Sequence, residues 1–334
     1  MNPIIAITLG DAAGIGPEII LKALAQPEIY RFCRPLVIGH KEMLSQTQTV
    51  LGLNIVLKTA TDASQIQPGE PAVWDFTDIP PPDVRPGNPD AATGGAAAAY
   101  IRKAVELALQ KQVAAMVTAP ISKYALHQAG YPYPGHTELL AELTQTKEYA
   151  MMLVGGPLRV ILVTTHCALK DVPARLSRPK LLEIIRLTHK YLPGWGVKNP
   201  RIAVAALNPH AGESGILGGE ERDILAPAIR QAQAQGIQVS GPWPADSLFY
   251  RAAQGEFNAV VCMYHDQGLI PLKLLAFRQA VNITLGLPIL RTSVGHGCAF
   301  DIAGKGQADP QSLIQAIKLA AQAIGAANNE KQPF

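Results

Sequence analysis

Short apolar segments alternate with longer amphipathic segments along most of the chain. Ile4–Thr8 has the continuous apolar character of a buried strand, and a glycine-rich turn then leads into a helix that starts near Pro17. Proline is tolerated at the first helical position, because the N–H that it lacks would have no partner there. The same pattern predicts strands at Pro35–Gly39, Asn54–Lys58, Ala114–Thr118, Met151–Val154, Arg159–Thr164, Arg201–Ala206 and Ala259–Tyr264.

Helical periodicity separates many of these strands. Helices are predicted over Ala91–Gln110, Pro179–Tyr191, Gly219–Gln235 and Pro310–Ala326, and the proline-rich segment Ile79–Pro89 predicts a loop. Alternation of strands and helices indicates an α/β protein with a mostly parallel sheet covered by helices on both faces. A chain of 334 residues is long enough for two lobes. The pattern gives no clear boundary between them, and a continuous sheet would make the lobes interleaved rather than sequential.

Composition and charge exclude several classes of protein. The net charge of +3 is too small to indicate a nucleic-acid partner, and no apolar stretch approaches the roughly 20 residues of a membrane span. The first residues lack the basic and apolar regions of a signal peptide. The four cysteines form no CxxC pair, which favours free thiols in a reducing compartment. We therefore expect a cytoplasmic protein that binds neither nucleic acid nor membrane.

Three histidines occupy equivalent places in the pattern. His166, His210 and His265 each follow the carboxyl end of a predicted strand. Ligands of open α/β sheets bind at that edge. A single histidine there is more often a hydrogen-bonded structural residue, but three at one edge favour a divalent metal with an open coordination position. The long separations along the chain leave both interpretations open.

Charged and polar residues follow the same segments. Asp266 comes directly after His265, and both Asp266 and Asp246 could transfer protons or orient a metal ligand. A simpler interpretation of Asp246 is a helix N-cap. Lys273 and Arg291 could bind a phosphate and a carboxylate, although either alone could be an ordinary surface cation, and Asn282 adds a neutral donor and acceptor.

The segment GHTELL places His136 and Thr137 at a predicted helix start. Thr137 could cap the helix, or the unpaired N–H groups of the first turn could bind an anion. The glycine-rich segments fit neither GxGxxG nor the P-loop pattern. A standard Rossmann fingerprint is therefore absent.

Longer motifs add a family resemblance to this picture. The run HGCAFDIAGKGQADP, His296–Pro310, resembles the loop that holds the cofactor's adenosine in isocitrate and isopropylmalate dehydrogenases. GDAAGIGPE, VTAPISK, GHTELLAE, VTTHCALKDVP, ALNPHAGESGILGGEE, GPWPADSLF, MYHDQGLIPLK and VNITLGLPILRTSVGHG together resemble the 4-hydroxythreonine-4-phosphate dehydrogenase family. The resemblance runs in order from about Ile4 to about Ile324.

The resemblance implies a two-lobed isocitrate/isopropylmalate dehydrogenase-like fold that forms one catalytic unit over residues 1–334, with the active site in the cleft between the lobes. It implies one divalent metal per subunit, which could be zinc, cobalt, magnesium or manganese, bound by His166, His210 and His265. It also implies a homodimer whose active site lies at the subunit interface, with one histidine from the partner chain. The implied substrate-binding residues are His136, Thr137, Lys273, Asn282 and Arg291.

The implied reaction uses NAD or NADP. The C3 hydroxyl of 4-phosphohydroxy-L-threonine is oxidised to a 3-keto acid, which loses carbon dioxide to give 3-amino-2-oxopropyl phosphate, a step of vitamin B6 biosynthesis. Asp246, Asp266 and Lys273 are candidates for proton transfer. The implied cofactor-binding residues are Gly295, His296, Gly297, Ala299 and Asp301. Gly295 and Cys298 depart from the commonest family residues, which leaves the choice between NAD and NADP open, and Ala12 replaces a frequent proline in a turn.

Other functions are compatible with the same fold. A sister enzyme acting on D-threonate or D-erythronate 4-phosphate would keep the metal, cofactor and phosphate residues. A non-catalytic metabolite-binding protein would be expected to lose one of those residues, whereas all are present here. An acyl phosphotransferase of distantly similar fold would not explain the HGCAFDIAGKG segment.

Overall fold

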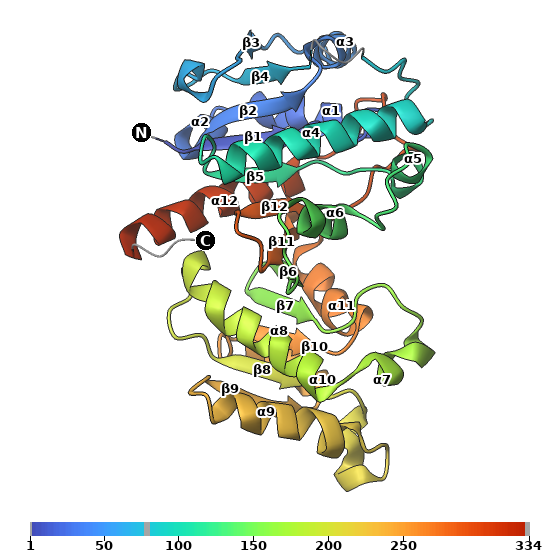
Figure 1. Cartoon of the computed structure of the whole chain (residues 1–334), viewed down its shortest axis with the longest axis vertical. Helices are drawn as coiled ribbons and strands as arrows, with labels where there is room; N and C mark the ends of the chain where they lie inside the picture. Colours follow the sequence, from blue (N-terminus) through green and yellow to red (C-terminus); the bar gives the residue numbers. More distant parts are fainter. Residues whose placement is uncertain (1, 77–80, 331–334) are drawn as a thin grey trace. The chain divides into compact units, whose positions relative to one another are not determined.

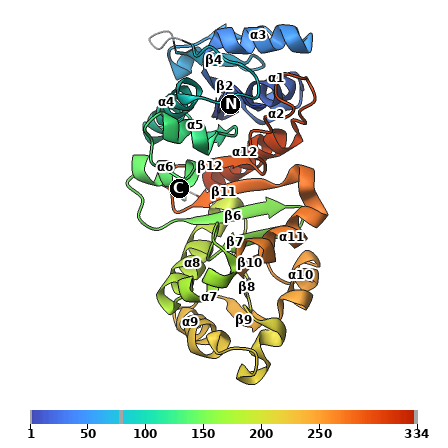
Figure 2. The same cartoon turned by 90° about the vertical axis from the view of Figure 1, so that its right-hand side faces the viewer.

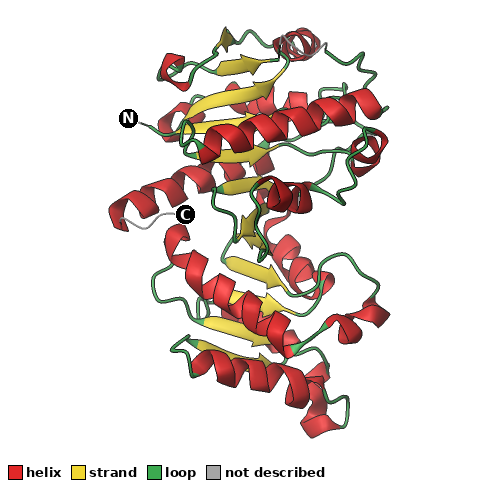
Figure 3. Cartoon of the chain, in the orientation of Figure 1, coloured by secondary structure: helices red, strands yellow, loops and turns green. Residues whose placement is uncertain are grey.

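The chain folds into two compact units, as the computed structural model shows for residues 2–76 and 81–330 (Figure 1). Unit 1 combines the chain up to Thr146 with Leu287–Asn329, and unit 2 comprises Lys147–Gly286. The chain thus leaves unit 1, builds unit 2 and returns to complete unit 1. Both units place strands between helices (Figure 3).

The sheet of unit 1 is parallel in every strand pair described. Its strands lie in the order β3-β4-β2-β1-β5-β12. They are β1 (Ile4–Thr8), β2 (Arg34–Gly39), β3 (Lys58–Thr59), β4 (Ala72–Asp75), β5 (Ala115–Thr118) and β12 (Arg291–Val294). Every residue of β1, β5 and β12 is buried, as expected for central strands covered on both faces.

Helices cover both faces of this sheet (Figure 2). α4 packs on one face, and α1 and α12 lie on the other. The helices of unit 1 are α1 (Gly16–Leu24), α2 (Ile29–Phe32), α3 (Lys41–Leu51), α4 (Ala91–Leu109), α5 (Lys123–Gln128), α6 (His136–Leu143) and α12 (Gln311–Glu330), with a 3₁₀ turn at Ala63–Gln65. α4 begins with a capping box, in which the Asp90 carboxylate accepts from Thr93 N–H at 2.8 Å and Thr93 Oγ1 accepts from Asp90 N–H at 3.1 Å.

The sheet of unit 2 is mixed. Its order is β11-β6-β7-β10-β8-β9, with β6 antiparallel to both β11 and β7 and the remaining pairs parallel. The strands are β6 (Ala150–Gly155), β7 (Leu158–Leu162), β8 (Ile202–Ala205), β9 (Val239–Trp243), β10 (Ala259–Cys262) and β11 (Val281–Leu285). The antiparallel part contains β6 and β7, which are joined by a tight turn at Gly156–Pro157.

α8 and α9 cover one face of this sheet, and α10 and α11 cover the other (Figure 2). The helices are α7 (Val172–Arg175), α8 (Arg178–Tyr191), α9 (Ala226–Gln233), α10 (Ala245–Ala253) and α11 (His265–Ala276). Shorter turns lie at Leu169–Asp171, Leu192–Trp195, Pro209–Gly215, Glu221–Leu225 and Phe277–Gln279. Leu248 of α10 and Leu272 of α11 are fully buried against Val160 and Val260 of the strands.

Most sequence-based predictions of elements are confirmed, and the fold class is confirmed with them. The strand predicted at Asn54–Lys58 is wrong, because only Lys58–Thr59 pairs, at the sheet edge. The helix predicted over Gly219–Gln235 begins with a π-helical turn at Glu221–Leu225 and continues directly into α9. The predicted loop is irregular from Pro81 to Pro89, and its residues 79 and 80 lie outside the described part of the chain.

All four cysteines are free thiols, as predicted. Burial raises the pKa of the Cys33 and Cys298 thiols to about 12. Within the described residues, no helix is long and apolar enough to cross a membrane.

Candidate active site

The three histidines singled out by sequence extend from neighbouring strands of unit 2. β7, β10 and β8 are adjacent and parallel, so their carboxyl ends meet at one edge of the sheet. His166 follows β7, His265 follows β10, and His210 follows β8. The structure therefore confirms that all three follow the same edge of one sheet, which is where α/β proteins bind ligands.

His166 and His265 lie next to each other. Their ring centroids are 5.5 Å apart. His265 is the first residue of α11, and its Nδ1 lies 2.7 Å from Asp266 Oδ1. A carboxylate that accepts from Nδ1–H fixes the tautomer in which Nε2 carries the lone pair for coordination. The Asp266 carboxylate is thus placed within hydrogen-bond distance of the His265 ring, as the predicted role of orienting a metal ligand requires.

His210 lies in an unusual turn. Residues His210–Ser214 all have left-handed backbone angles, with φ between 45° and 82°. Non-glycine residues avoid this region, at a cost of roughly 1–2 kcal/mol each. Within the turn, His210 Nδ1 lies 2.6 Å from Glu213 Oε1, and this hydrogen bond and charge, together with Asp246, raise the pKa of His210.

Glu221 is the residue that holds this turn in place. Its buried Oε1 accepts from the backbone N–H of Leu207 at 2.9 Å and of Asn208 at 2.7 Å, and its Oε2 accepts from Asn208 Nδ2 at 3.0 Å. The Asn208 amide also donates to Glu220 Oε2 at 2.9 Å. Hydrogen bonds to a buried carboxylate are strong enough to offset backbone strain in the turn.

The described residues of a single chain do not form a complete metal site. No group of three or more His, Cys, Asp or Glu side chains among them could hold a metal ion. Of the three predicted ligands, only His166 and His265 are adjacent, and His210 is exposed on its own turn. Asp246 is exposed in the first turn of α10, and Pro244 occupies the N-cap position, so the N-cap interpretation of Asp246 is wrong.

α11 carries further predicted site residues beside an exposed apolar surface. A groove of about 520 Å³ is lined by His265, Asp266, Leu269, Ile270, Lys273, Leu274 and Phe277. The Lys273 ammonium lies 5.8 Å from the centre of the Phe277 ring. This places Lys273 two helical turns from His265 and in the same groove.

Unit 1 contains a second cluster, around Arg291. This arginine is 1% exposed on β12, and its Nε and Nη2 donate to Thr118 Oγ1 at 3.2 and 2.7 Å. Burial lowers the pKa of Arg291 to about 9, with the Glu138 carboxylate opposing this shift, so the side chain remains a cation at neutral pH. Arg291 is therefore not the surface cation that the sequence left possible.

His136 lies within the field of this buried cation. Burial, followed by the charge of Arg291, lowers the pKa of His136 well below 6.5, so the imidazole is neutral at pH 7. Its Nε2 is buried and has no hydrogen-bond partner among the described residues. A buried polar atom without a partner costs free energy, which a bound polar ligand would recover.

Two other substrate-binding predictions have clear positions. Thr137 is buried in the first turn of α6, where Gly135 is the N-cap residue, so the interpretation of Thr137 as the cap is wrong. Asn282 lies on β11 of unit 2, and its Oδ1 is buried without a partner among the described residues. Asn282 Oδ1 could therefore accept a hydrogen bond from a ligand.

The segment predicted to bind the cofactor follows β12 in unit 1. Gly295 N–H donates to Ser312 Oγ at 3.0 Å, and Ala299 has a left-handed φ of 45°. His296 and Gly297 are exposed, as is Asp301, whose carbonyl accepts from Lys305 Nζ at 2.7 Å. Three of the five predicted binding residues in this segment are thus exposed, whereas Gly295 and Ala299 are half-buried.

Sequence reasoning missed several residues of these clusters. Glu213 and Glu221 position the His210 turn, and Thr118 and Glu138 surround Arg291. Glu213 could have been found from its position three residues after His210. The other three contact the site across many intervening residues, and the sequence carries no local signal for those contacts.

Comparison with known proteins adds a family to this geometry. Residues 31–320 match the family model described as "Pyridoxal phosphate biosynthetic protein PdxA". The chain belongs to this family. Its relatives include a 4-hydroxythreonine-4-phosphate dehydrogenase of Geobacter metallireducens, which is 49% identical over 96% of this chain and 95% of that protein. A D-threonate 4-phosphate dehydrogenase of Cupriavidus necator is 46% identical over 96% and 97% of the two chains.

A solved family structure has the same fold. The crystal structure of 4-hydroxythreonine-4-phosphate dehydrogenase from Klebsiella pneumoniae matches with a TM-score of 0.90 at 44% identity and covers 97% of this chain and 98% of its own. The family resemblance predicted from the sequence is therefore confirmed. So is the prediction of an oxidoreductase, because the relatives that match over nearly the whole chain are dehydrogenases.

Proposed function

We propose that this protein oxidises the C3 hydroxyl of 4-phosphohydroxy-L-threonine with NAD or NADP, and that the 3-keto acid then loses carbon dioxide to give 3-amino-2-oxopropyl phosphate. The proposal places the protein in vitamin B6 biosynthesis. Its main support is the edge of the unit 2 sheet that His166, His210 and His265 follow. Relatives that match over nearly the whole chain and are named for this activity add to that support.

The nitrogen ligands support a divalent metal. His166 and His265 are adjacent, and Asp266 directs the Nε2 of His265 outward for coordination. His210 would complete the set, and we propose that it does so from the partner chain of a homodimer. Imidazole suits zinc and cobalt, and oxygen ligands from the substrate would also accommodate magnesium or manganese. A bound metal would act as a Lewis acid toward the hydroxyl and ketone oxygens of the substrate.

Several polar and charged residues support an anionic substrate. Arg291 offers a planar fork for a phosphate or carboxylate, and the neutral His136 beside it offers an N–H donor. Lys273 supplies a second cation, while Asn282 and Thr137 supply neutral polar atoms. Lys273, Asp266 and Asp246 are the candidates to give or take the proton of the reacting oxygen. We assign Gly295, His296, Gly297, Ala299 and Asp301 to cofactor binding.

One alternative has specific support. The D-threonate 4-phosphate dehydrogenase of Cupriavidus necator is nearly as similar as the relative from Geobacter metallireducens. The two substrates share the phosphate, the carboxylate and the C3 hydroxyl and differ at C2, which carries an amine in one and a hydroxyl in the other. The predicted metal and phosphate residues would serve both.

An activity assay decides between them. Protein stripped with a chelator is mixed with 4-phosphohydroxy-L-threonine and NAD or NADP, and the absorbance of the reduced cofactor is followed with and without added zinc, cobalt or magnesium. We expect metal-dependent reduction that is at least about tenfold faster than with D-threonate or D-erythronate 4-phosphate, because a fitted polar contact at C2 is worth about 1.4 kcal/mol or more. Faster reduction with a sugar-acid phosphate would assign the sister activity. Absence of reduction with every substrate after metal addition would refute both.

The surface of α11 supports the homodimer. Ile270, Leu274 and Phe277 are 64%, 84% and 73% exposed, and they line the groove that also contains His265 and Lys273. Exposed apolar patches next to functional residues are typical of protein interfaces. A partner on this helix would bury the patch and enclose the candidate site.

A charge on this patch should separate the subunits. We expect Leu274→Asp to shift the sedimentation coefficient from dimer to monomer at micromolar concentration and to abolish dehydrogenase activity. Leu109→Asp is the matched control, because Leu109 is also an exposed leucine, on α4 of unit 1. A dimeric Leu274→Asp protein, or a fully active monomer, would contradict the proposed interface.

A further inference from the structure

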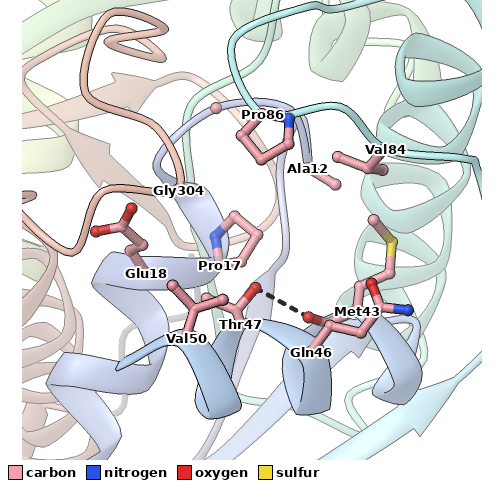
Figure 4. A pocket seen from close by; sticks show the side chains of 11 residues that line it. Ala12, Pro17, Glu18, Met43, Gln46, Thr47, Val50, Val84, Pro86 and Gly304 are labelled. Carbon is pink, nitrogen blue, oxygen red and sulfur yellow. Dashed lines mark hydrogen bonds between the residues drawn. The ribbon is translucent and has the colours of Figure 1, made fainter. Parts of the chain in front are cut away.

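Two places in the described part of unit 1 differ in the charge that they would offer a ligand. The first is a cavity of about 260 Å³ between the start of α1 and one side of α3 (Figure 4). No Lys, Arg or His is present among the described residues that line it. The Glu18 carboxylate on its wall lies 3.9 Å from Lys22 Nζ and accepts from Ala308 N–H at 3.4 Å, and Lys22 Nζ donates to Ala308 O at 2.7 Å. The described wall of this cavity therefore does not favour an anionic group.

The second place surrounds Gly135, the N-cap residue of α6. A Cβ atom at Gly135 would lie 3.7 Å from Lys123 Cε and 3.6 Å from Glu138 Oε2. The side chains of Lys123 and Glu138 therefore extend toward the same point, from α5 and from the first turn of α6. The next residue is His136, whose buried Nε2 has no partner among the described residues. An ammonium group thus lies beside a predicted substrate-binding residue.

The start of α5, which carries Lys123, is held in place by its neighbours. Ser122 is buried at the N-cap position, and its Oγ accepts from Ala125 N–H at 3.1 Å. On α4, a Cβ atom at Gly94 would lie 2.1 Å from Ala125 O, so only glycine allows the two helices to approach this closely. Lys123 is the first residue of α5, and its side chain is exposed. Its ammonium can therefore turn toward a ligand while its backbone stays fixed.

The chain segment that carries Lys123 also contacts Arg291. Thr118 is the last residue of β5, shortly before Lys123, and its Oγ1 accepts from Arg291 Nε at 3.2 Å and from Nη2 at 2.7 Å. Burial, and then the charge of Arg291, lowers the pKa of His136, so the guanidinium acts on the imidazole that follows Gly135. Lys123 and Arg291 therefore both lie near Gly135 and His136.

The charges of these side chains determine which group they can bind. The Glu138 carboxylate opposes the burial that lowers the pKa of Arg291, so these two opposite charges act on each other. Each offsets part of the other's field, and the neutral His136 adds no charge. A phosphate ester carries a charge of about −1.5 to −2 at pH 7. The Lys123 ammonium supplies the further positive charge that favours such a group.

We propose that Lys123 binds the phosphate group of the substrate together with Arg291 and His136, and that Glu138 opposes this binding, so that it depends on Lys123. The inference rests on the proposed function, and it applies to either of the phosphorylated substrates considered there. Lysine supplies a point charge with three donors, whereas Arg291 supplies a planar fork. Lys123 is thus a binding residue, and it transfers neither hydride nor proton.

Calorimetry and kinetics on the full chain test the proposal. Inorganic phosphate is the probe, because its binding is measured without turnover. Its dissociation constant, and kcat and KM for the phosphorylated substrate, are measured for the wild type, Lys123→Met, Lys123→Arg, Glu138→Gln, Arg291→Met and Lys111→Met. Lys111 is the matched control, because it is an exposed lysine that precedes β5, whereas Lys123 follows this strand. Far-UV circular dichroism and thermal unfolding establish that each variant is folded.

We expect Lys123→Met to weaken phosphate binding about tenfold or more, which corresponds to about 1.4 kcal/mol or more, as is typical of a hydrogen bond to a charged group. KM should rise by a similar factor with little change in kcat, because the contact is made equally in the bound substrate and in the transition state. Lys123→Arg should restore most of the affinity, Arg291→Met should weaken phosphate binding, and Lys111→Met should leave it unchanged. Glu138→Gln should tighten phosphate binding, because it removes a negative charge.

Equal phosphate affinities of folded Lys123→Met and Lys111→Met proteins would overturn the proposal. Weaker phosphate binding by Glu138→Gln would also overturn it, because Lys123 and Glu138 would then act as a structural ion pair. A loss of kcat without a change in KM in Lys123→Met would assign Lys123 to the chemical step and not to binding. A protein that binds phosphate through Lys123 but reduces no cofactor would refute the proposed reaction without refuting this site.

Discussion

Replacement of His265 by alanine is expected to lower kcat by a factor on the order of 10³ with saturating substrate and metal. A metal that acts as a Lewis acid contributes several kcal/mol to transition-state stabilisation, which corresponds to a rate factor of about this size. His265 is the proposed ligand whose orientation the structure defines best, through the 2.7 Å contact of its Nδ1 with Asp266. Metal affinity, measured by competition with a chromophoric chelator, should fall in the same variant.

Two further variants make the expectation specific. Asp266→Asn keeps the coordinating imidazole but weakens its orientation, and such changes around metal ligands typically cost about 10- to 100-fold in affinity or activity. His127→Ala removes an exposed histidine from α5 of unit 1 and should leave both readouts unchanged. If His265→Ala kept the full metal affinity of the wild type, the metal would not bind at the sheet edge that carries His166, His210 and His265.

Arg291→Met should have the second largest effect, on substrate rather than metal. Removal of one partner of a buried charged contact costs about 2–5 kcal/mol, so kcat/KM for the phosphorylated substrate should fall by roughly 30-fold to several thousand-fold. The guanidinium also satisfies the Thr118 hydroxyl, which the variant leaves without this donor. The charge to be lost is present at neutral pH, since the pKa of Arg291, although lowered, is about 9.

Arg291→Lys separates charge from geometry. Lysine keeps the positive charge but lacks the planar fork, so we expect an intermediate kcat/KM with the loss mainly in KM. Thermal unfolding and far-UV circular dichroism of both variants, with NAD binding by calorimetry, distinguish a local loss from unfolding. Wild-type kcat/KM in a folded Arg291→Met protein would remove Arg291 from the substrate site.

The regular elements were largely predictable because their signals are local. β1 was predicted with the bounds that it has in the structure, Ile4–Thr8, and α4 differs from its prediction by a single residue at its end. The error at Asn54–Lys58 has a physical cause. This segment has the composition of a strand, but it lies at the edge of the sheet, where only Lys58 and Thr59 find a partner in β4.

The site was only partly predictable. His166, His210 and His265 were identified as site candidates because each follows a predicted strand. The carboxyl ends of parallel strands lie at one edge of the sheet, where ligands bind. The left-handed turn that presents His210 has no sequence signature apart from its glycines, since most of its strained residues are not glycine. Its stability comes from Glu221, and the hydrogen bonds of a single buried carboxylate do not show in any periodicity.

By itself, the sequence determined the α/β class, most strands and helices, the family and the residue types of the candidate site, because each depends on periodicity or on motifs of adjacent residues. Only the tertiary structure decided that the histidines follow adjacent strands, that Arg291 is buried against Thr118 beside a neutral His136, and that Glu18 and Lys22 fasten α1 to the segment after β12. These last features are contacts between residues far apart in the chain. Their strength comes from burial and hydrogen-bond geometry, which exist only once the chain has folded.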